Sequence, residues 1–549
     1  MRMYKLLLTL TLAVVSAQAL SMGGGGENMD AIIDEIAKTM PEQTDEMLPT
    51  PLIDALIAKN FDQIKTLLDE GTDPNEANAA GMTILMLSAY VGAADTSKYL
   101  LEKGADVNLT DADERTALMF ASTGGNAEIV KMLLDKGVNV NALADEGETA
   151  LYFAASEGNL EAARLLLDHD ATAETSDDSQ QTPLMLAAQG GHTDIAMRLI
   201  DAGANIKSRD DKSKTVLMYA IEGESQPLVS TLLDQGADPN AHTRKNNFVP
   251  LHMAIWKGNM AIVKRLLDAG AKADSKTLED DSLLMAAVAR NKPEIIDLLI
   301  EKGADINGKN KHGETVLMIA AQSGLPETSQ MLLDKGAQLD AVNADDWTAL
   351  TFAATGNHVD VLEVLVKAGA NMEVKDKTKG GTPLYLAVVH GNIDAMKFLL
   401  DKGANPNSRG FFESTPLIQA ADRGRTNFIN ALADKGAEIN ALDGHGMSAL
   451  HYAAMSKSPG AVQALIDYKA DVHKKTRQGV TPLLFAAWFG DMGSIEALLK
   501  AGADPNIIDL DGKTALDYAI ARRRGQAVVT LLEQAGAKTA DDLASSQAN

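Results

Sequence analysis

Apolar and small residues recur in a fixed order along this chain, and the stretch Thr481–Asn506 shows that order clearly. Thr481 precedes a Pro and a Leu, and two alanines follow before Gly490 interrupts the pattern. Isoleucine and leucine then recur at helical spacing up to Gly502. Thr is a good N-cap, Pro fits the first helical position, and Gly suits the residue that ends a helix. The stretch therefore predicts a helix, a tight turn, a second helix and an extended segment.

The Thr at the start of this stretch marks a register that continues through the chain. The register positions are Thr50, Thr83, Thr116, Thr149, Thr182, Thr215, Val249, Ser282, Thr315, Thr348, Thr382, Thr415, Ser448, Thr481 and Thr514. Successive positions lie 33 residues apart, except for two steps of 34 residues that end at Val249 and Thr382. A fixed period of this length is typical of stacked structural repeats. About fifteen repeats are expected, because each helix pair must bury its apolar side against its neighbours.

The repeated segment resembles the ankyrin repeat. The first-helix signature of that family is Thr-Pro-Leu-His, and Val249–His252 matches it most nearly. The last residues of the ankyrin repeat are matched by Gly104–Asn108 and Gly502–Asn506. The resemblance implies an all-α repeat solenoid, in which each 33-residue repeat is a helix-turn-helix followed by a β-hairpin loop. It covers roughly residues 48–537, which we expect to form the ankyrin repeat domain.

Two positions depart from the ankyrin pattern. The His that ties the first helix to the hairpin is kept at His252 and His451, and Met is expected to replace its hydrogen bond with flexible packing in six repeats. These methionines are Met86, Met119, Met185, Met218, Met285 and Met318. The family also favours Gly two residues before the register position, where the hairpin needs a positive φ. Other residues stand there at Glu114, Gln180, Ser213, Asn247, Asp280, Asp346 and Glu413. This predicts irregular hairpins in residues 110–290 and near Glu413.

The N-terminal residues have the pattern of a secretory signal peptide. Residues 1–19 combine basic Arg2 and Lys5 with a short apolar run and an Ala-x-Ala ending, which predicts cleavage near Ala19. Residues 20–47 contain a Gly-rich tether and a helix with one apolar face, which either caps the first repeat or binds a partner. Residues 538–549 are expected to form a polar C-terminal tail. We therefore expect a periplasmic or secreted bacterial protein.

Composition narrows the classes of partner. The formal net charge is −26, which disfavours nucleic acid and anionic membrane surfaces. After the leader, no apolar run is long enough to insert into a membrane. The chain has no cysteine, so neither disulfides nor thiolate chemistry are possible. We expect a monomer.

Motifs that carry chemistry are not found in the sequence. It lacks a nucleophile elbow, a phosphate-binding loop and a His-Glu-x-x-His motif. The ten histidines are scattered, so no metal site is expected, and the repeats leave no segment for a catalytic domain. The protein is therefore expected to be non-enzymatic, with no catalytic residues and no cofactor.

The resemblance also indicates where a partner would bind. Ankyrin proteins usually grip partners with hairpin tips and the exposed ends of the first helices on their concave side. In this register these are the residues four, three and one before the register position and seven and eight after it, which we call the edge positions. Large aromatic residues, which the repeat does not require, occupy edge positions at Tyr90, Phe248, Trp256, Trp347, Phe411, Phe412, Trp488 and Phe489. Exposed aromatic residues dominate binding hot spots, although each could instead pack locally over its neighbours.

The sequence thus favours a scaffold that holds one or more protein partners through its concave face. Two other functions fit the same sequence. An exported effector or toxin acting on another cell is compatible with the leader, but no toxic domain is visible. A mechanical spacer would need no specialised face. The sequence does not identify the partner, because the ankyrin fold does not by itself define a function beyond binding.

Overall fold

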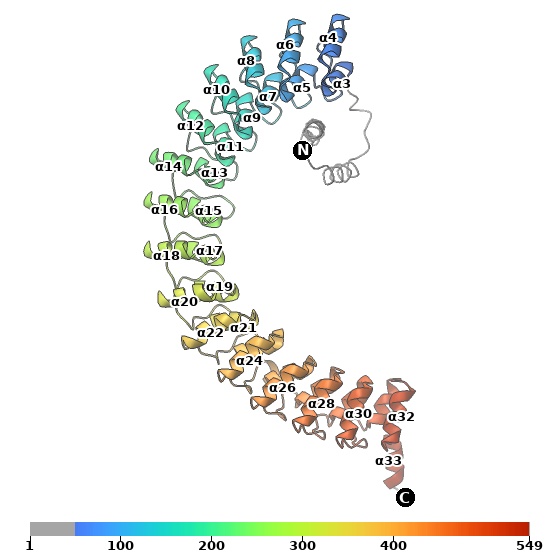
Figure 1. The fold of residues 1–549 in the computed structure, drawn as a ribbon. Helices are drawn as coiled ribbons and strands as arrows, with labels where there is room; N and C mark the ends of the chain where they lie inside the picture. Colours follow the sequence, from blue (N-terminus) through green and yellow to red (C-terminus); the bar gives the residue numbers. More distant parts are fainter. Residues whose placement is uncertain (1–49, 548–549) are drawn as a thin grey trace, which may run out of the picture. The chain divides into compact units, whose positions relative to one another are not determined.

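The structure, a computed structural model, describes residues 50–547. The expected signal peptide (1–19) and the tether and capping helix (20–47) lie outside the described residues. Within them, each register residue is followed by a first helix of seven or eight residues, and a second helix of nine residues comes next (Figure 1). The chain divides into two compact units, of which the first ends at Ala271 and the second begins at Lys272. Each is described by itself below.

In the first compact unit the helices follow one another in pairs. Its first helices are α3 (Pro51–Ile57), α5 (Ile84–Val91), α7 (Ala117–Thr123), α9 (Ala150–Glu157), α11 (Pro183–Gln189), α13 (Val216–Glu222) and α15 (Pro250–Lys257). Its second helices are α4 (Phe61–Asp69), α6 (Ala94–Glu102), α8 (Ala127–Asp135), α10 (Leu160–Asp168), α12 (Thr193–Asp201), α14 (Gln226–Asp234) and α16 (Met260–Asp268).

The second compact unit continues the same order. Its first helices are α17 (Leu283–Ala289), α19 (Val316–Gln322), α21 (Ala349–Thr355), α23 (Pro383–His390), α25 (Pro416–Asp422), α27 (Ala449–Met455), α29 (Pro482–Phe489) and α31 (Ala515–Ala521). Its second helices are α18 (Pro293–Glu301), α20 (Pro326–Asp334), α22 (Val359–Lys367), α24 (Ile393–Asp401), α26 (Thr426–Asp434), α28 (Pro459–Asp467), α30 (Met492–Lys500) and α32 (Gln526–Gln534). A short 3₁₀ helix, η2 (Phe411–Glu413), precedes α25, and α33 (Ala540–Gln547) lies in the expected tail.

The register residue begins each first helix as an N-cap. The Thr83 hydroxyl accepts a hydrogen bond from the Met86 amide at 3.3 Å, and most of the other register residues cap in the same way. Val249 has no side-chain oxygen and makes no such cap, but its own amide donates to His252 Nδ1 at 3.2 Å. The Thr caps satisfy amide groups that the first turn of a helix leaves unpaired. The helix starts predicted from the register are therefore confirmed.

The core lies between the helix pairs of neighbouring repeats. Within each compact unit, every first helix packs against the first helix of the next repeat, as α11 does against α13. Leu184, Met185, Ala187 and Ala188 of α11 are each at most 1% exposed. The small alanines allow close approach, and the larger residues fill the space that remains. Each compact unit is therefore an all-helical solenoid, as the 33-residue period predicts.

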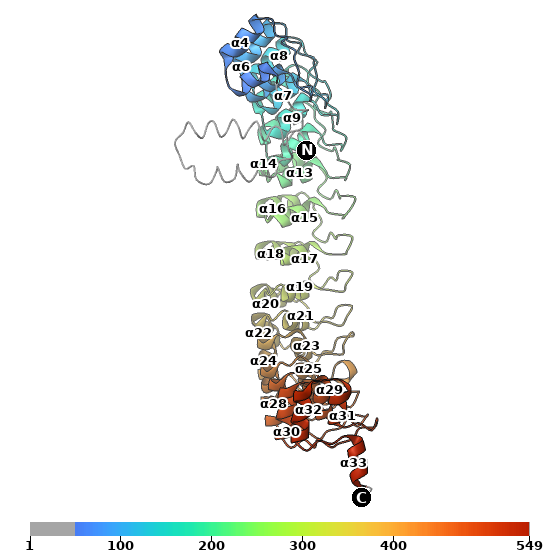
Figure 2. The same cartoon turned by 90° about the vertical axis from the view of Figure 1, so that its right-hand side faces the viewer.

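The hairpins have short backbone pairing. Among the described residues the only β-structure is a set of isolated antiparallel bridges. These bridges are Ala77↔Thr83, Thr110↔Thr116, Arg209↔Thr215, Lys276↔Ser282 and Leu442↔Ser448. Figure 2 shows the hairpin loops of the second compact unit on the same side of its row as the first helices α17, α19 and α21. Hairpin tips and first helices therefore border a common surface.

The structure corrects two expectations about the departures from the family pattern. Four of the six methionines keep a hydrogen bond, because the sulfur accepts the amide of the register residue; in the Thr116–Met119 pair this distance is 3.4 Å. Four of the hairpins without Gly in residues 110–290 are regular, with a φ of 58° at Glu114 and 61° at Gln180, whereas the hairpin at Asn247 is one residue longer. Near Glu413 the expectation is confirmed, since Phe412 and Glu413 both have a positive φ and form η2.

Candidate partner-binding surface

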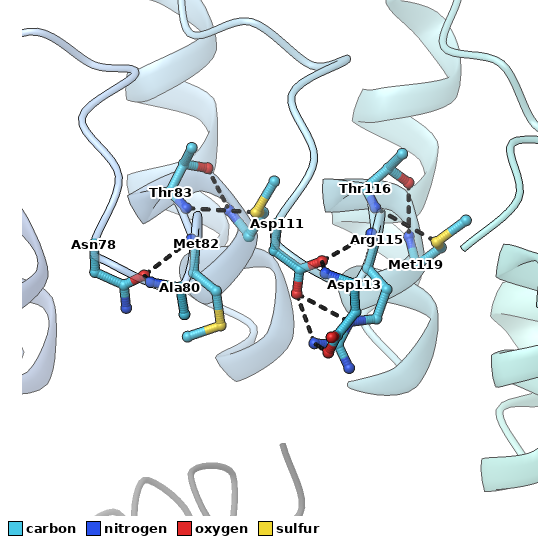
Figure 3. A network of polar contacts seen from close by, with 10 residues as sticks. Asn78, Ala80, Met82, Thr83, Asp111, Asp113, Arg115, Thr116 and Met119 are labelled. Carbon is cyan, nitrogen blue, oxygen red and sulfur yellow. Dashed lines mark hydrogen bonds and ion pairs between the residues drawn. The ribbon is translucent and has the colours of Figure 1, made fainter. Parts of the chain in front are cut away.

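Many hairpins are held in shape by an Asn or Asp side chain that stands five residues before the register position. Asn78 Oδ1 accepts the amides of Ala80 and Met82, both at 3.0 Å, and Asp111 Oδ1 accepts those of Asp113 and Arg115 (Figure 3). The same pair of bonds recurs at Asp210, Asn310, Asn343, Asp443 and Asp509. An Asx oxygen that accepts two amides closes the turn both where Gly has the positive φ, as at Gly81, and where another residue has it, as at Glu114.

Neighbouring hairpins are joined through their backbones. The Ala112 amide donates to the Ala80 carbonyl at 2.9 Å in the first compact unit. In the second, the Ala344 amide donates to the His312 carbonyl at 2.9 Å. Because each bond links a hairpin to the one before it, the tips within a compact unit form a row with fixed spacing.

Several hairpins are also tied to the first helix of their own repeat. The hydroxyl groups of Tyr219, Tyr452 and Tyr518 donate to the hairpin carboxylates of Asp210, Asp443 and Asp509 at 2.9, 2.6 and 2.5 Å. Burial, and then the neighbouring carboxylate, raises the pKa of Tyr452 and Tyr518, so these phenols stay protonated as donors. The loop edge is therefore rigid and able to present side chains in fixed positions.

In the first compact unit, two of the aromatic residues predicted as binding sites lie together. Phe248 is half-buried and stacks on the His252 ring, with 5.3 Å between ring centroids. Its ring centroid lies 6.4 Å from that of Trp256, whose side chain is 57% exposed. Tyr90, at the end of α5, is half-buried and belongs to another repeat. Phe248 and Trp256 therefore form one small aromatic cluster, and Tyr90 is separate from it along the row.

Trp347 lies in the second compact unit and leans on its own repeat. It is half-buried, and its ring lies edge-on to Phe352 with 5.1 Å between centroids. The Nε1 atom of Trp347 is buried without a hydrogen-bond partner. The ring of Trp347 thus packs against its own repeat, which is the alternative to partner binding that the sequence left open for each aromatic residue.

Phe411 and Phe412 are the most open aromatic pair of the second compact unit. They are 56% and 57% exposed, and their ring centroids lie 4.2 Å apart. The η2 turn projects them from the hairpin, and the Phe412 ring lies 5.0 Å from that of His445 in the next hairpin.

Trp488 lies further along the same row, at the end of α29. It is half-buried, with its ring centroid 4.8 Å from that of Tyr518 and the Arg522 guanidinium carbon 3.8 Å from its centroid. Its carbonyl accepts a hydrogen bond from Arg524 Nε at 2.6 Å. Phe489 follows it and is half-buried beside Gly490, which ends the helix with a φ of 69°.

A groove of about 420 Å³ opens beside Trp488, and we call it the C-terminal groove. Its lining includes His445, Arg477, Phe485, Trp488, Asp511 and Tyr518. These residues come from three successive hairpins and from the first helices α29 and α31. His445 and Arg477 stand at edge positions, and so does Arg522 beside Trp488. None of these three was predicted as a binding residue, because the prediction rested on large aromatic residues at the edge positions.

The eight predicted residues do not make one cluster. They lie in separate groups along the two compact units, at Tyr90, at Phe248 with Trp256, at Trp347, at Phe411 with Phe412, and at Trp488 with Phe489. In residues 50–547 no helix is long and apolar enough to cross a membrane. That same part of the chain contains no group of three or more His, Asp or Glu side chains arranged to hold a metal ion.

Comparisons with known proteins identify the repeat. A family model described as ankyrin repeats (3 copies) matches residues 26–111, 106–177, 170–243, 251–343, 338–410, 407–476 and 458–542. The chain is similar to the crystal structure of the human ASB11 ankyrin repeat domain, with 26% identity over 41% of this chain and 99% of that chain and a TM-score of 0.38. A search of curated proteins found no match. Because the family model matches nearly all of residues 26–542, the protein belongs to the ankyrin repeat family, whose members generally act as non-enzymatic modules for protein–protein interaction.

Proposed function

We propose that the protein is a non-catalytic scaffold of about fifteen ankyrin repeats that binds protein partners through its hairpin tips and first helices. The observation that carries this proposal is the distribution of exposed apolar side chains. Of the twelve large hydrophobic residues exposed in the described chain, seven stand at the edge positions, which are only five positions of each repeat. These seven are Ile57, Val91, Trp256, Leu278, Phe411, Phe412 and Leu510.

This distribution supports binding over a spacer role. A spacer needs no particular face, so its exposed apolar residues should be spread evenly around the repeat. Apolar residues gathered on one edge of a soluble protein are typical of interaction surfaces. The signal-peptide pattern of residues 1–19 supports a bacterial protein located in the periplasm or outside the cell.

The proposal is tested by in-cell cross-linking and affinity recovery from the separated periplasm and medium of the source organism. We expect wild-type protein to recover a partner that a Trp256→Ala, Phe411→Ala, Phe412→Ala variant loses, because all three side chains are more than half exposed. Truncating exposed aromatic anchors removes binding energy without opening a core cavity. Trp347 and Trp488 are left intact, since both pack against neighbouring rings.

The matched control is Met260→Ala, Met492→Ala. Both methionines are apolar, like the three aromatic residues, and are 39% and 40% exposed. They differ in position, because they begin second helices and stand outside the edge positions. Recovery by the control and loss by the aromatic variant would support the proposed face. Equal recovery by both variants would place binding elsewhere, and recovery of no partner by wild-type protein would reject the scaffold function. The fraction that holds the protein decides between periplasm and medium.

A further inference from the structure

The C-terminal groove combines aromatic walls with cations that lack acidic partners. Arg477 is exposed and makes no ion pair with any described residue. Arg522 does not line the groove itself but stacks on the ring of its lining residue Trp488, and it is also without an ion pair in residues 50–547. Lys474 and Lys475 precede Arg477 in the same hairpin. These four cations give the groove and its border a local positive charge on a chain whose net charge is −26.

The stacking of Arg522 decides which charge the groove accepts. A cation already covers the Trp488 face, so a cationic ligand would find that face occupied. A stacked guanidinium keeps its in-plane N–H groups available, and these match the two oxygens of a carboxylate. The one acidic side chain among the lining residues named above, Asp511, is exposed at the opposing hairpin tip and reduces the positive charge without cancelling it.

The shape of the groove favours a peptide. Its volume of about 420 Å³ falls within the roughly 300–1,000 Å³ that ligand sites span. Its aromatic side chains, Phe485, Trp488 and Tyr518, would contact an apolar side chain. The surface continues past His445 to the exposed rings of Phe411 and Phe412, so it is longer than one residue would need.

We propose that the C-terminal groove binds an acidic peptide segment of a partner protein. One apolar side chain of the segment lies against Trp488 and Tyr518, and flanking carboxylates bind Arg477 and Arg522. This proposal rests on the scaffold function and assigns the chemistry of one partner site to it. Peptide recognition of this kind combines aromatic anchors with charge-assisted hydrogen bonds.

The test uses purified full-length protein and three labelled ten-residue peptides. The first alternates Asp and Glu with Leu and Phe, the second has Asn and Gln in place of the acids, and the third has Lys. Binding is read by fluorescence anisotropy of the label and by Trp emission. A Trp256→Phe, Trp347→Phe background leaves Trp488 as the single tryptophan of the chain. We expect only the acidic peptide to bind, with a change in Trp488 emission and an affinity that falls as NaCl is added.

The variants Arg477→Glu and Lys397→Glu make a matched pair. Both reverse one exposed positive charge, but Lys397 lies on second helix α24, outside the groove. We expect Arg477→Glu to weaken acidic-peptide binding by about tenfold or more and Lys397→Glu to leave it near the wild-type value. Circular dichroism confirms that both variants are folded.

Other results would overturn the proposal. These are equal binding of the neutral or Lys peptide, equal weakening by both variants, acidic-peptide binding that leaves Trp488 emission unchanged, and no binding at all. A change in Trp488 emission with protein concentration alone would assign the groove to a second copy of the chain. If the cell experiment recovers a partner and the peptides fail, the groove chemistry is wrong and the scaffold function stands. If the acidic peptide binds and no partner is recovered from cells, the groove chemistry stands and the scaffold function is rejected.

Discussion

His451 joins two neighbouring repeats through both of its ring nitrogens. Its Nδ1 accepts the Ser448 amide at 3.1 Å, and its Nε2 donates to the carbonyls of Lys474 and Val480 at 3.0 and 3.2 Å. The side chain is fully buried, and this burial lowers the pKa of His451 from its usual 6.5 to about 4. A proton on Nδ1 would break the bond to Ser448 and place a charge in the core.

The first prediction concerns the stability of this segment at low pH. The pKa of His451 is lower in the folded than in the unfolded chain. The contribution of neutral His451 to folding stability is therefore complete above pH 6.5 and is lost as the pH falls toward 4. We expect the opening free energy of residues 449–485 to drop by on the order of 3 kcal/mol over that range in the wild type and by less in His451→Gln. Hydrogen exchange of both proteins at each pH measures the difference, with His169→Gln, an exposed histidine, as control. Equal losses in all three would contradict the prediction.

At the scale of the structural element, the hairpin keeps the same side-chain bonds whether Gly or another residue has the positive φ. Glu114 has a φ of 58°, which an L-residue adopts at an energetic cost, and the bonds to Asp111 hold it there. We expect Glu114→Gly to stabilise its repeat by up to about 1 kcal/mol, because Gly adopts a positive φ without a steric cost. Local hydrogen exchange at residues 110–135 measures the change. The control is Glu161→Gly in the first turn of α10, expected to destabilise by about the same amount, and a loss of stability in Glu114→Gly would reject the argument.

The sequence predicted the helices because register and periodicity act locally. Thr83 and Thr116 begin helices where the pattern places them, since N-capping depends on only a few neighbouring residues. The Asx side chains at Asn78 and Asp111 were missed, although their recurrence five residues before the register Thr was visible in the sequence. The Met sulfur bonds were not predicted, because a thioether sulfur is a weak acceptor and a Met in the sequence indicates apolar packing rather than a hydrogen bond.

The candidate site was harder to predict because exposure depends on other repeats. Trp256 and Trp488 stand at the same position in their repeats, seven residues after the register residue. Trp256 is 57% exposed, whereas Trp488 is half-buried under Tyr518 and Arg522, which belong to the following repeat. No pattern within one repeat distinguishes these two cases. The groove itself is lined by three successive hairpins, so no pattern within one repeat predicts it.

At the scale of the whole molecule, stability is expected to be local, because the helix packing in each compact unit links neighbouring repeats. Ala353 in α21 is fully buried between α19 and α23. We expect Ala353→Arg to remove amide protection from α19–α24 and to leave residues 84–201 of the first compact unit protected, because a large charged side chain cannot fit between those helices. Hydrogen exchange with mass spectrometry maps the loss. Glu363→Arg, on the exposed side of α22, should leave protection unchanged, and simultaneous loss along the whole chain would show that unfolding is all-or-none.

The buried methionine sulfurs have a further consequence in an environment that contains peroxide. Met86, Met119, Met285 and Met318 are at most 2% exposed, so an oxidant reaches them only when their first helix separates from its neighbours. The sulfoxide that forms is larger and more polar than the thioether and does not fit back beneath the register residue. Oxidation at each position would therefore accumulate in proportion to the time its repeat spends open. The distribution of methionine sulfoxide along the chain would report which repeats open most often.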